Sequence, residues 1–195
     1  MINQLTQAAQ LAQAAYASLS QGRTVNSQGN LAAQDFTLSQ RNDFIARYPT
    51  IVTQYNDLTA GGMGTGFNAT VFMDTAGQLS LAIRGTDDLL GNDRLADSDI
   101  FLSGAGYDQI VAMVNWWARA SAPDEQMVNQ FRLVELVDVP AGAVVLRAGS
   151  VEGTSYVLDA APQAAGLGLV EAEAAVNVTG HSMGGHLALA FKTLA

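Results

Sequence analysis

The sequence contains no cysteine in its 195 residues, which excludes disulfide bonds and thiolate metal sites. Basic residues are also scarce, because nine Lys and Arg oppose eighteen Asp and Glu and give a formal net charge of −9. Without a cluster of basic residues, we expect neither nucleic-acid binding nor charge-driven binding to anionic membranes. The two histidines, His181 and His186, lack the glutamate of the zinc-protease helix motif, so a catalytic metal is not expected either.

Long apolar runs are missing as well, and no segment approaches the length of a membrane span. The first five residues carry no positive charge, and the segment after them is amphipathic and rich in glutamine, unlike a conventional N-terminal signal peptide. Apolar residues nevertheless make up 49% of the sequence and charged residues only 14%, a balance typical of one globular domain.

Apolar periodicity predicts the main elements of this domain. Helices are predicted over residues 3–20, 39–48 and 107–120, with Ser39 as the N-cap of the second and an aromatic stripe of the third packed in the core. Strands are predicted over 50–55 and over 66–73 and 79–83, the last two joined as a hairpin. Residues 22–30 and the glycine cluster 61–66 are interpreted as loops, and 133–170 are not assigned. This order predicts an α/β sandwich.

The most informative motif is Gly180-His181-Ser182-Met183-Gly184, which matches G-x-S-x-G, the nucleophile elbow of α/β-hydrolases. The residues before it, 175–179, alternate as a short strand should, and residues 184–194 are a small-residue stretch with helix-forming Leu and Ala. A strand, a tight turn and a helix are the context that this motif requires.

The elbow predicts the roles of its residues. Ser182 is the candidate nucleophile, and the backbone amide of Met183 at the helix N-terminus is a candidate oxyanion donor. Gly180 and Gly184 permit the crowded turn, where a side chain would strike the neighbouring strand or helix. His181 leaves the strand in a different direction from Ser182, and His186 lies four residues further on the helix. Neither histidine is expected to be the general base.

Two ordered motifs resemble the class 3 lipases, most closely the bacterial lipases and phospholipases exported by type I machinery. They are Ala82-Ile83-Arg84-Gly85-Thr86 and, about a hundred residues later, the serine elbow. The resemblance spans roughly residues 35–195 and implies that Thr86 occupies the first oxyanion position, with Met183 supplying the second donor. It implies no cofactor for the chemistry.

The family pattern places an acid and then a histidine after the elbow, and no histidine follows His186 here, so the triad acid and histidine are expected from sequence beyond residue 195. The expectation is therefore an incomplete α/β-hydrolase sandwich: residues 1–195 form the N-terminal part of one catalytic domain, through the elbow and its helix. Since the elbow strand is central in that fold, a C-terminal remainder, continuing or as a separate chain, is expected to cover the edge that would otherwise be open.

The acidic residues that follow Thr86 allow several interpretations. Related lipases place a lid in this position, and the apolar residues interleaved here would suit a lid that contacts a lipid interface. The oxygen-rich spacing of Asp97 and Asp99 would also suit a structural Ca²⁺ ion, although no EF-hand-like loop is present. A solvated polar loop is the simplest interpretation.

The leading hypothesis is a serine ester hydrolase that cleaves lipid-like carboxylic esters through an acyl-enzyme at Ser182. Phospholipase, polyester hydrolase and thioesterase activities are alternatives within the same fold, because the acyl pocket and lid determine specificity. A catalytically incomplete module that binds lipid or a partner is the alternative outside enzymes. Low lysine content, acidity and absent cysteine fit secretion by type I export, and a cytosolic protein could share these traits.

Overall fold

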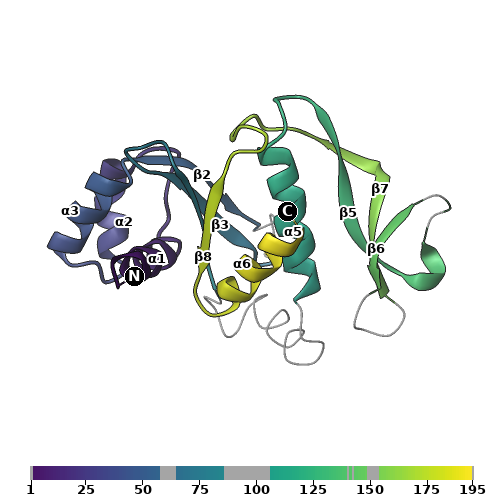
Figure 1. Ribbon diagram of the computed structural model, residues 1–195, viewed down its shortest axis with the longest axis horizontal. Helices are drawn as coiled ribbons and strands as arrows, with labels where there is room; N and C mark the ends of the chain where they lie inside the picture. Colours follow the sequence, from purple (N-terminus) through teal and green to yellow (C-terminus); the bar gives the residue numbers. More distant parts are fainter. Residues whose placement is uncertain are drawn as a thin grey trace.

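Strands from both ends of the chain form one five-stranded sheet in a computed structural model (Figure 1), in which the described residues are 2–57, 65–85, 106–139, 141, 143–148 and 154–194. The strand order is β1-β2-β3-β4-β8. The strands are β1 (Gly22–Arg23), β2 (Thr50–Asn56), β3 (Asn68–Met73), β4 (Leu79–Ile83) and β8 (Val176–Gly180). Neighbouring strands are antiparallel except for β4 and β8, which run parallel with Ile83 opposite Gly180. The fold is therefore mixed α/β with a mostly antiparallel sheet.

Helices cover both faces of this sheet (Figure 1). On one side lie α1 (Ile2–Ala14), η1 (Thr24–Ser27), α2 (Gln28–Ala32) and α3 (Leu38–Arg47); on the other lie α5 (Tyr107–Ala120) and α6 (Met183–Leu194). The side chains of β3 and β4 lie alternately on the two faces of the sheet. Phe72 and Ala82 pack with α1–α3, whereas Val71 and Leu81 pack with α5 and α6. Both strands are therefore buried on each face, as the central strands of a three-layer structure should be.

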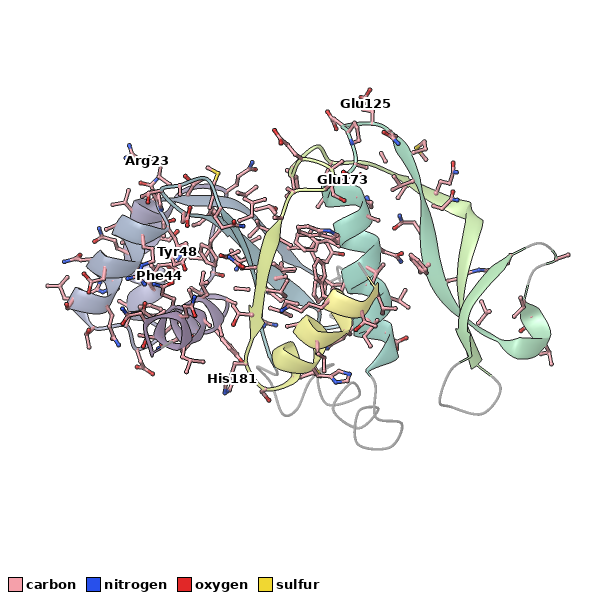
Figure 2. All side chains as sticks on the ribbon, viewed as in Figure 1. Arg23, Phe44, Tyr48, Glu125, Glu173 and His181 are labelled. Atoms are coloured by element: carbon pink, nitrogen blue, oxygen red, sulfur yellow. The ribbon has the colours of Figure 1, made fainter. Side chains whose placement is uncertain are left out.

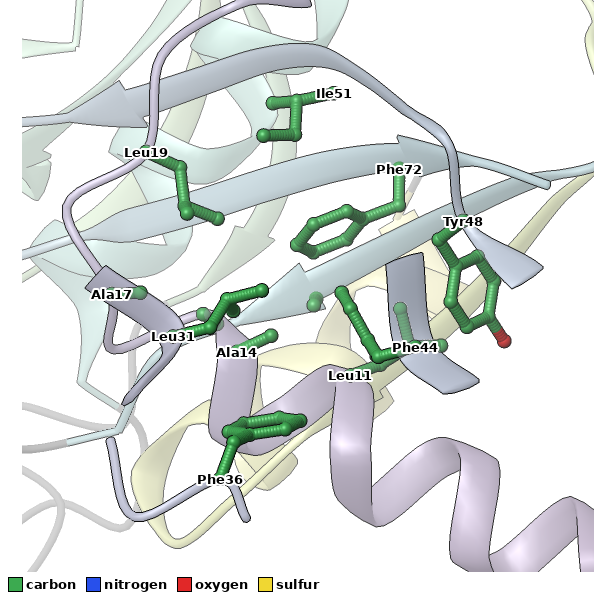
Figure 3. Packing of buried hydrophobic residues seen from close by; sticks show 12 residues of the cluster. Leu11, Ala14, Ala17, Leu19, Leu31, Phe36, Phe44, Tyr48, Ile51 and Phe72 are labelled. Carbon is green, nitrogen blue, oxygen red and sulfur yellow. The ribbon is translucent and has the colours of Figure 1, made fainter. Parts of the chain in front are cut away.

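The core beneath α1–α3 is built around aromatic rings (Figure 3). The ring of Phe44 on α3 meets the ring of Phe72 edge to face at a centroid distance of 5.4 Å, and it also contacts Phe36 and Tyr48. Edge-to-face pairs of this kind stabilise a core beyond the area that they bury. α3 is thereby held on the sheet.

A second, three-stranded sheet follows α5 and has the order β5-β7-β6. Its strands are β5 (Met127–Glu135), β6 (Val144–Ala148) and β7 (Thr154–Ala165), all antiparallel, with η2 (Leu136–Asp138) after β5. The side chain of Asn115 on α5 joins this sheet to the helix, because it accepts from the backbone N–H of Phe131 at 2.6 Å and donates to its carbonyl at 2.9 Å. This sheet occupies most of the stretch that periodicity left unassigned.

Several sequence predictions are confirmed and others need correction. The hairpin, the strand at 50–55 and the helix over 107–120 are confirmed, and Ile110, Met113, Val114 and Trp116 of that helix lie in the core. The first helix ends at Ala14 and not at residue 20. Residues 22–30 are not a simple loop, since they contain β1, η1 and the start of α2. Most of the glycine cluster, residues 61–64, lies outside the described residues.

The cap of α3 also differs from the prediction of Ser39. Thr37 is the N-cap, with its hydroxyl accepting from Gln40 N–H while the Gln40 side chain accepts from Thr37 N–H. This reciprocal pair is a capping box, which satisfies two amides that a helix start otherwise leaves unpaired.

Within the part of the chain that the structure describes, no helix is long and apolar enough to cross a membrane.

Candidate active site

The turn between β8 and α6 has the geometry of a nucleophile elbow. Ser182 adopts φ +55°, in the left-handed region that L-residues rarely occupy, and α6 begins at the next residue, Met183. The carbonyl oxygens of His181 and Ser182 accept from the amides of Gly184 and Gly185, each at 2.9 Å. The chain thus reverses within two residues, and the exposed Ser182 is presented at the helix N-terminus.

Gly180 and Gly184 lie so close to neighbouring backbone atoms that a side chain does not fit at either position. A Cβ on Gly180 would clash with the carbonyl group of Gly184, and a Cβ on Gly184 would clash with the backbone of Ile83 and Arg84. Backbone atoms held in a sheet or helix cannot rotate away as a side chain can. The close approach of the elbow to the end of β4, which pairs with β8, therefore requires glycine at position 184, and the tight turn itself requires glycine at position 180.

The end of β4 continues directly into the site. A Cβ on Gly85 would lie 3.1 Å from the Cβ of Ser182 and closer still to the carbonyl oxygen of His181. Thr86, the predicted first oxyanion residue, lies outside the described residues. The residue directly before it is nevertheless in contact with the elbow.

Ser182 lies where a helix N-terminus can stabilise negative charge. The first amides of a helix point outward along its axis and carry a partial positive charge. The amides of Gly184 and Gly185 are used within the turn, whereas that of Met183 makes no hydrogen bond within the described part of the chain. Met183 is buried through its side chain, which holds its backbone in place. Its amide is thus not used by the hydrogen bonds of the turn, which is compatible with the predicted role as an oxyanion donor.

No hydrogen bond joins either histidine to Oγ of Ser182 among the described residues. His181 lies where β8 turns into α6 (Figure 2), and its Nδ1 is 3.3 Å from the Tyr16 hydroxyl. His186 lies on α6, partly buried. Among the described residues, none makes a hydrogen bond with Oγ of Ser182.

Tyr16 is the residue at this site that sequence reasoning missed. Its spacing fits the apolar stripe of the first helix, but it lies just after α1, and its hydroxyl also accepts from the Gly85 N–H at 3.1 Å. Because Tyr16 and His181 are 165 positions apart, no local pattern could indicate their contact.

No metal site is visible in the described residues, which hold no group of three or more His, Cys, Asp or Glu side chains suited to a metal ion. Asp97 and Asp99, the Ca²⁺ candidates, lie outside the described residues.

Two of the described tyrosines that pack in the core have a raised pKa. Burial raises the pKa of Tyr48 and of Tyr55, and the Asp57 carboxylate adds to the rise at Tyr55.

The left-handed backbone at Ser182 predicts how glycine and alanine at this position change the free energy of unfolding. Left-handed conformation costs an L-residue about 1–2 kcal/mol, a cost that glycine lacks. We expect Ser182→Gly to have a free energy of unfolding about 1 kcal/mol higher than Ser182→Ala in urea titrations. Ser39, in the ordinary helix α3, is the matched control, and there the glycine variant should be the less stable one by about 1 kcal/mol. Equal stabilities of the two Ser182 variants would contradict the strained turn.

Comparison with known proteins found no match. No protein-family model, no curated protein and no solved structure matches the chain.

Proposed function

We propose that the protein is a serine ester hydrolase of α/β-hydrolase fold, with Ser182 as its nucleophile. The observation that supports this most strongly is the left-handed Ser182 at a strand-to-helix turn, flanked by Gly180 and Gly184 that tolerate no Cβ. A turn of this kind is strained, and strain of this kind is concentrated at functional sites. The three-layer arrangement and the parallel β4–β8 pair agree with that fold.

In this proposal Oγ of Ser182 attacks the carbonyl carbon of a carboxylic ester and loses its proton to a general base. The developing oxyanion accepts from the Met183 amide and from Thr86, and collapse of the tetrahedral species expels the alcohol and leaves the acyl group on Ser182. Water then releases the acid and restores the serine. In the family pattern the base is a histidine that follows the elbow, with an acid before it in the chain. Lipid-like esters are the substrate class that the resemblance to class 3 lipases implies.

The alternative is a hydrolase-like module that binds lipid or a partner without turnover. The observation that favours it is that no described residue makes a hydrogen bond with Oγ of Ser182. An intact elbow argues against it, because a binding module has no need of a serine held in a strained conformation.

Covalent labelling of the serine distinguishes the ester hydrolase from the binding module. We expect the protein, together with the segment that supplies its base, to react with a fluorophosphonate probe, to gain the mass of one phosphonyl group, and to carry that group on Ser182 after proteolysis. An unreactive chain, or label spread over several exposed serines at equal rates, would favour the binding module. The chain denatured in urea is the control, since it keeps the serine and loses the elbow.

A further inference from the structure

The hydroxyl of Tyr16 lies where three distant segments of the chain meet. It accepts from the backbone N–H of Gly85, directly after β4, at 3.1 Å, and lies 3.3 Å from Nδ1 of His181 in the elbow. The two rings also meet edge to face, with centroids 6.3 Å apart. A Cβ on Gly85 would be 2.7 Å from this hydroxyl and 3.1 Å from the Cβ of Ser182. Tyr16 and Ser182 therefore border the same small space.

The backbone that carries Tyr16 is firmly anchored. Its neighbours Ala15 and Ala17 are buried at 1% and 2% exposure. The amide of the Gln54 side chain on β2 donates to the Ala17 carbonyl at 2.9 Å, and its oxygen accepts from Leu19 N–H at 2.8 Å. Buried, hydrogen-bonded backbone of this kind has few alternative positions. The Tyr16 ring thus extends from a rigid support toward the two segments that it joins.

We propose that Tyr16 is a positioning residue that sets the distance between the end of β4 and the elbow. This inference rests on the proposed function, because these two segments carry the two oxyanion donors, Thr86 and the Met183 amide. The Gly85 amide is occupied by Tyr16 and is not available to an oxyanion. The same hydroxyl engages His181, the residue before the nucleophile, so one oxygen atom joins the residue before Thr86 to the residue before Ser182.

The variant Tyr16→Phe removes this oxygen and keeps the ring. In the full chain we expect the Gly85 amide to exchange with solvent at least about tenfold faster, and the amide resonances of Ser182 and Met183 to shift in ¹H–¹⁵N NMR spectra. In ester hydrolysis we expect kcat to fall about 10- to 100-fold with KM within about twofold, because small displacements of oxyanion donors weaken transition-state binding more than substrate binding.

Tyr48→Phe is the matched control, since it removes a tyrosine hydroxyl from the α1–α3 side of the sheet. It should leave the Gly85, Ser182 and Met183 amides and kcat unchanged. Unchanged Ser182 and Met183 resonances in Tyr16→Phe would overturn the positioning role, as would an unchanged kcat in a chain that hydrolyses esters. Lack of Ser182-dependent turnover in the wild-type protein together with the segment that supplies its base would instead overturn the proposed function, and the NMR result would still decide whether Tyr16 holds the elbow.

Discussion

Replacing Ser182 with alanine is expected to lower the turnover of p-nitrophenyl esters by at least about 10³-fold, because the acyl-enzyme cannot form without Oγ. The oxyanion donors and the binding surface remain in the variant, so a small residual rate above that of water is expected. Ser182 is exposed and its hydroxyl makes no hydrogen bond within the described part of the chain, so its loss removes no structural contact seen there. Initial rates at several substrate concentrations, together with urea denaturation, measure both effects.

Ser39→Ala is the control for this substitution. Ser39 is an exposed serine on α3, in the helical layer on the opposite side of the sheet from α6. Its loss should leave the turnover within about twofold of that of the wild type, because surface substitutions away from special features have small effects. If Ser182→Ala kept more than a tenth of the wild-type turnover, the hydrolysis would come from another group and the proposed role of Ser182 would be wrong.

The second large effect is expected at Gly184. Alanine at this position should lower the free energy of unfolding by about 3 kcal/mol, because its Cβ would meet the carbonyl groups of Ile83 and Arg84 at the end of β4. These atoms belong to backbone beside the β4–β8 pairing, so the clash is relieved only when α6 moves away from the sheet. That movement would also displace Ser182, and the variant should lose hydrolysis as well as stability.

Gly185→Ala is the matched control one residue further along α6. A Cβ there would have its nearest neighbours at 3.4 and 3.9 Å, which are ordinary contact distances. Alanine is favoured over glycine within a helix by about 1 kcal/mol, so this variant should be slightly more stable than the wild type. Urea titrations of both variants measure the difference. If they were equally stable, the close approach of α6 to β4 would not exist in solution.

Local patterns predicted much of the fold. Apolar residues at helical spacing indicated the helix over 107–120, and alternation with a short turn indicated the hairpin of β3 and β4. These elements follow from side-chain periodicity within a few residues, which is present in the sequence itself. The cap of α3 was misplaced at Ser39 because Thr37 and Ser39 are both suitable caps, and only the reciprocal bonds with Gln40 decide between them.

The sheet order was less accessible to sequence reasoning. The strands of residues 127–165 were not assigned, because short runs broken by Pro and Gly carry little periodic signal. The family resemblance implied an elbow strand with an open sheet edge beside it, and β8 pairs with β4 alone among the described strands. Strand pairing depends on contacts between segments nearly a hundred residues apart, and local patterns contain no information on them.

By itself, the sequence determined the local chemistry of this protein: the serine between two glycines, and the strand and helix that make the turn, since each depends on neighbouring residues alone. Only the tertiary structure decided what surrounds that serine. It showed that Gly184 must be glycine because Ile83 lies against it, and that the Tyr16 hydroxyl joins Gly85 to the elbow. These features arise where β4, β8 and the end of α1 converge, and such convergence exists only once the chain has folded.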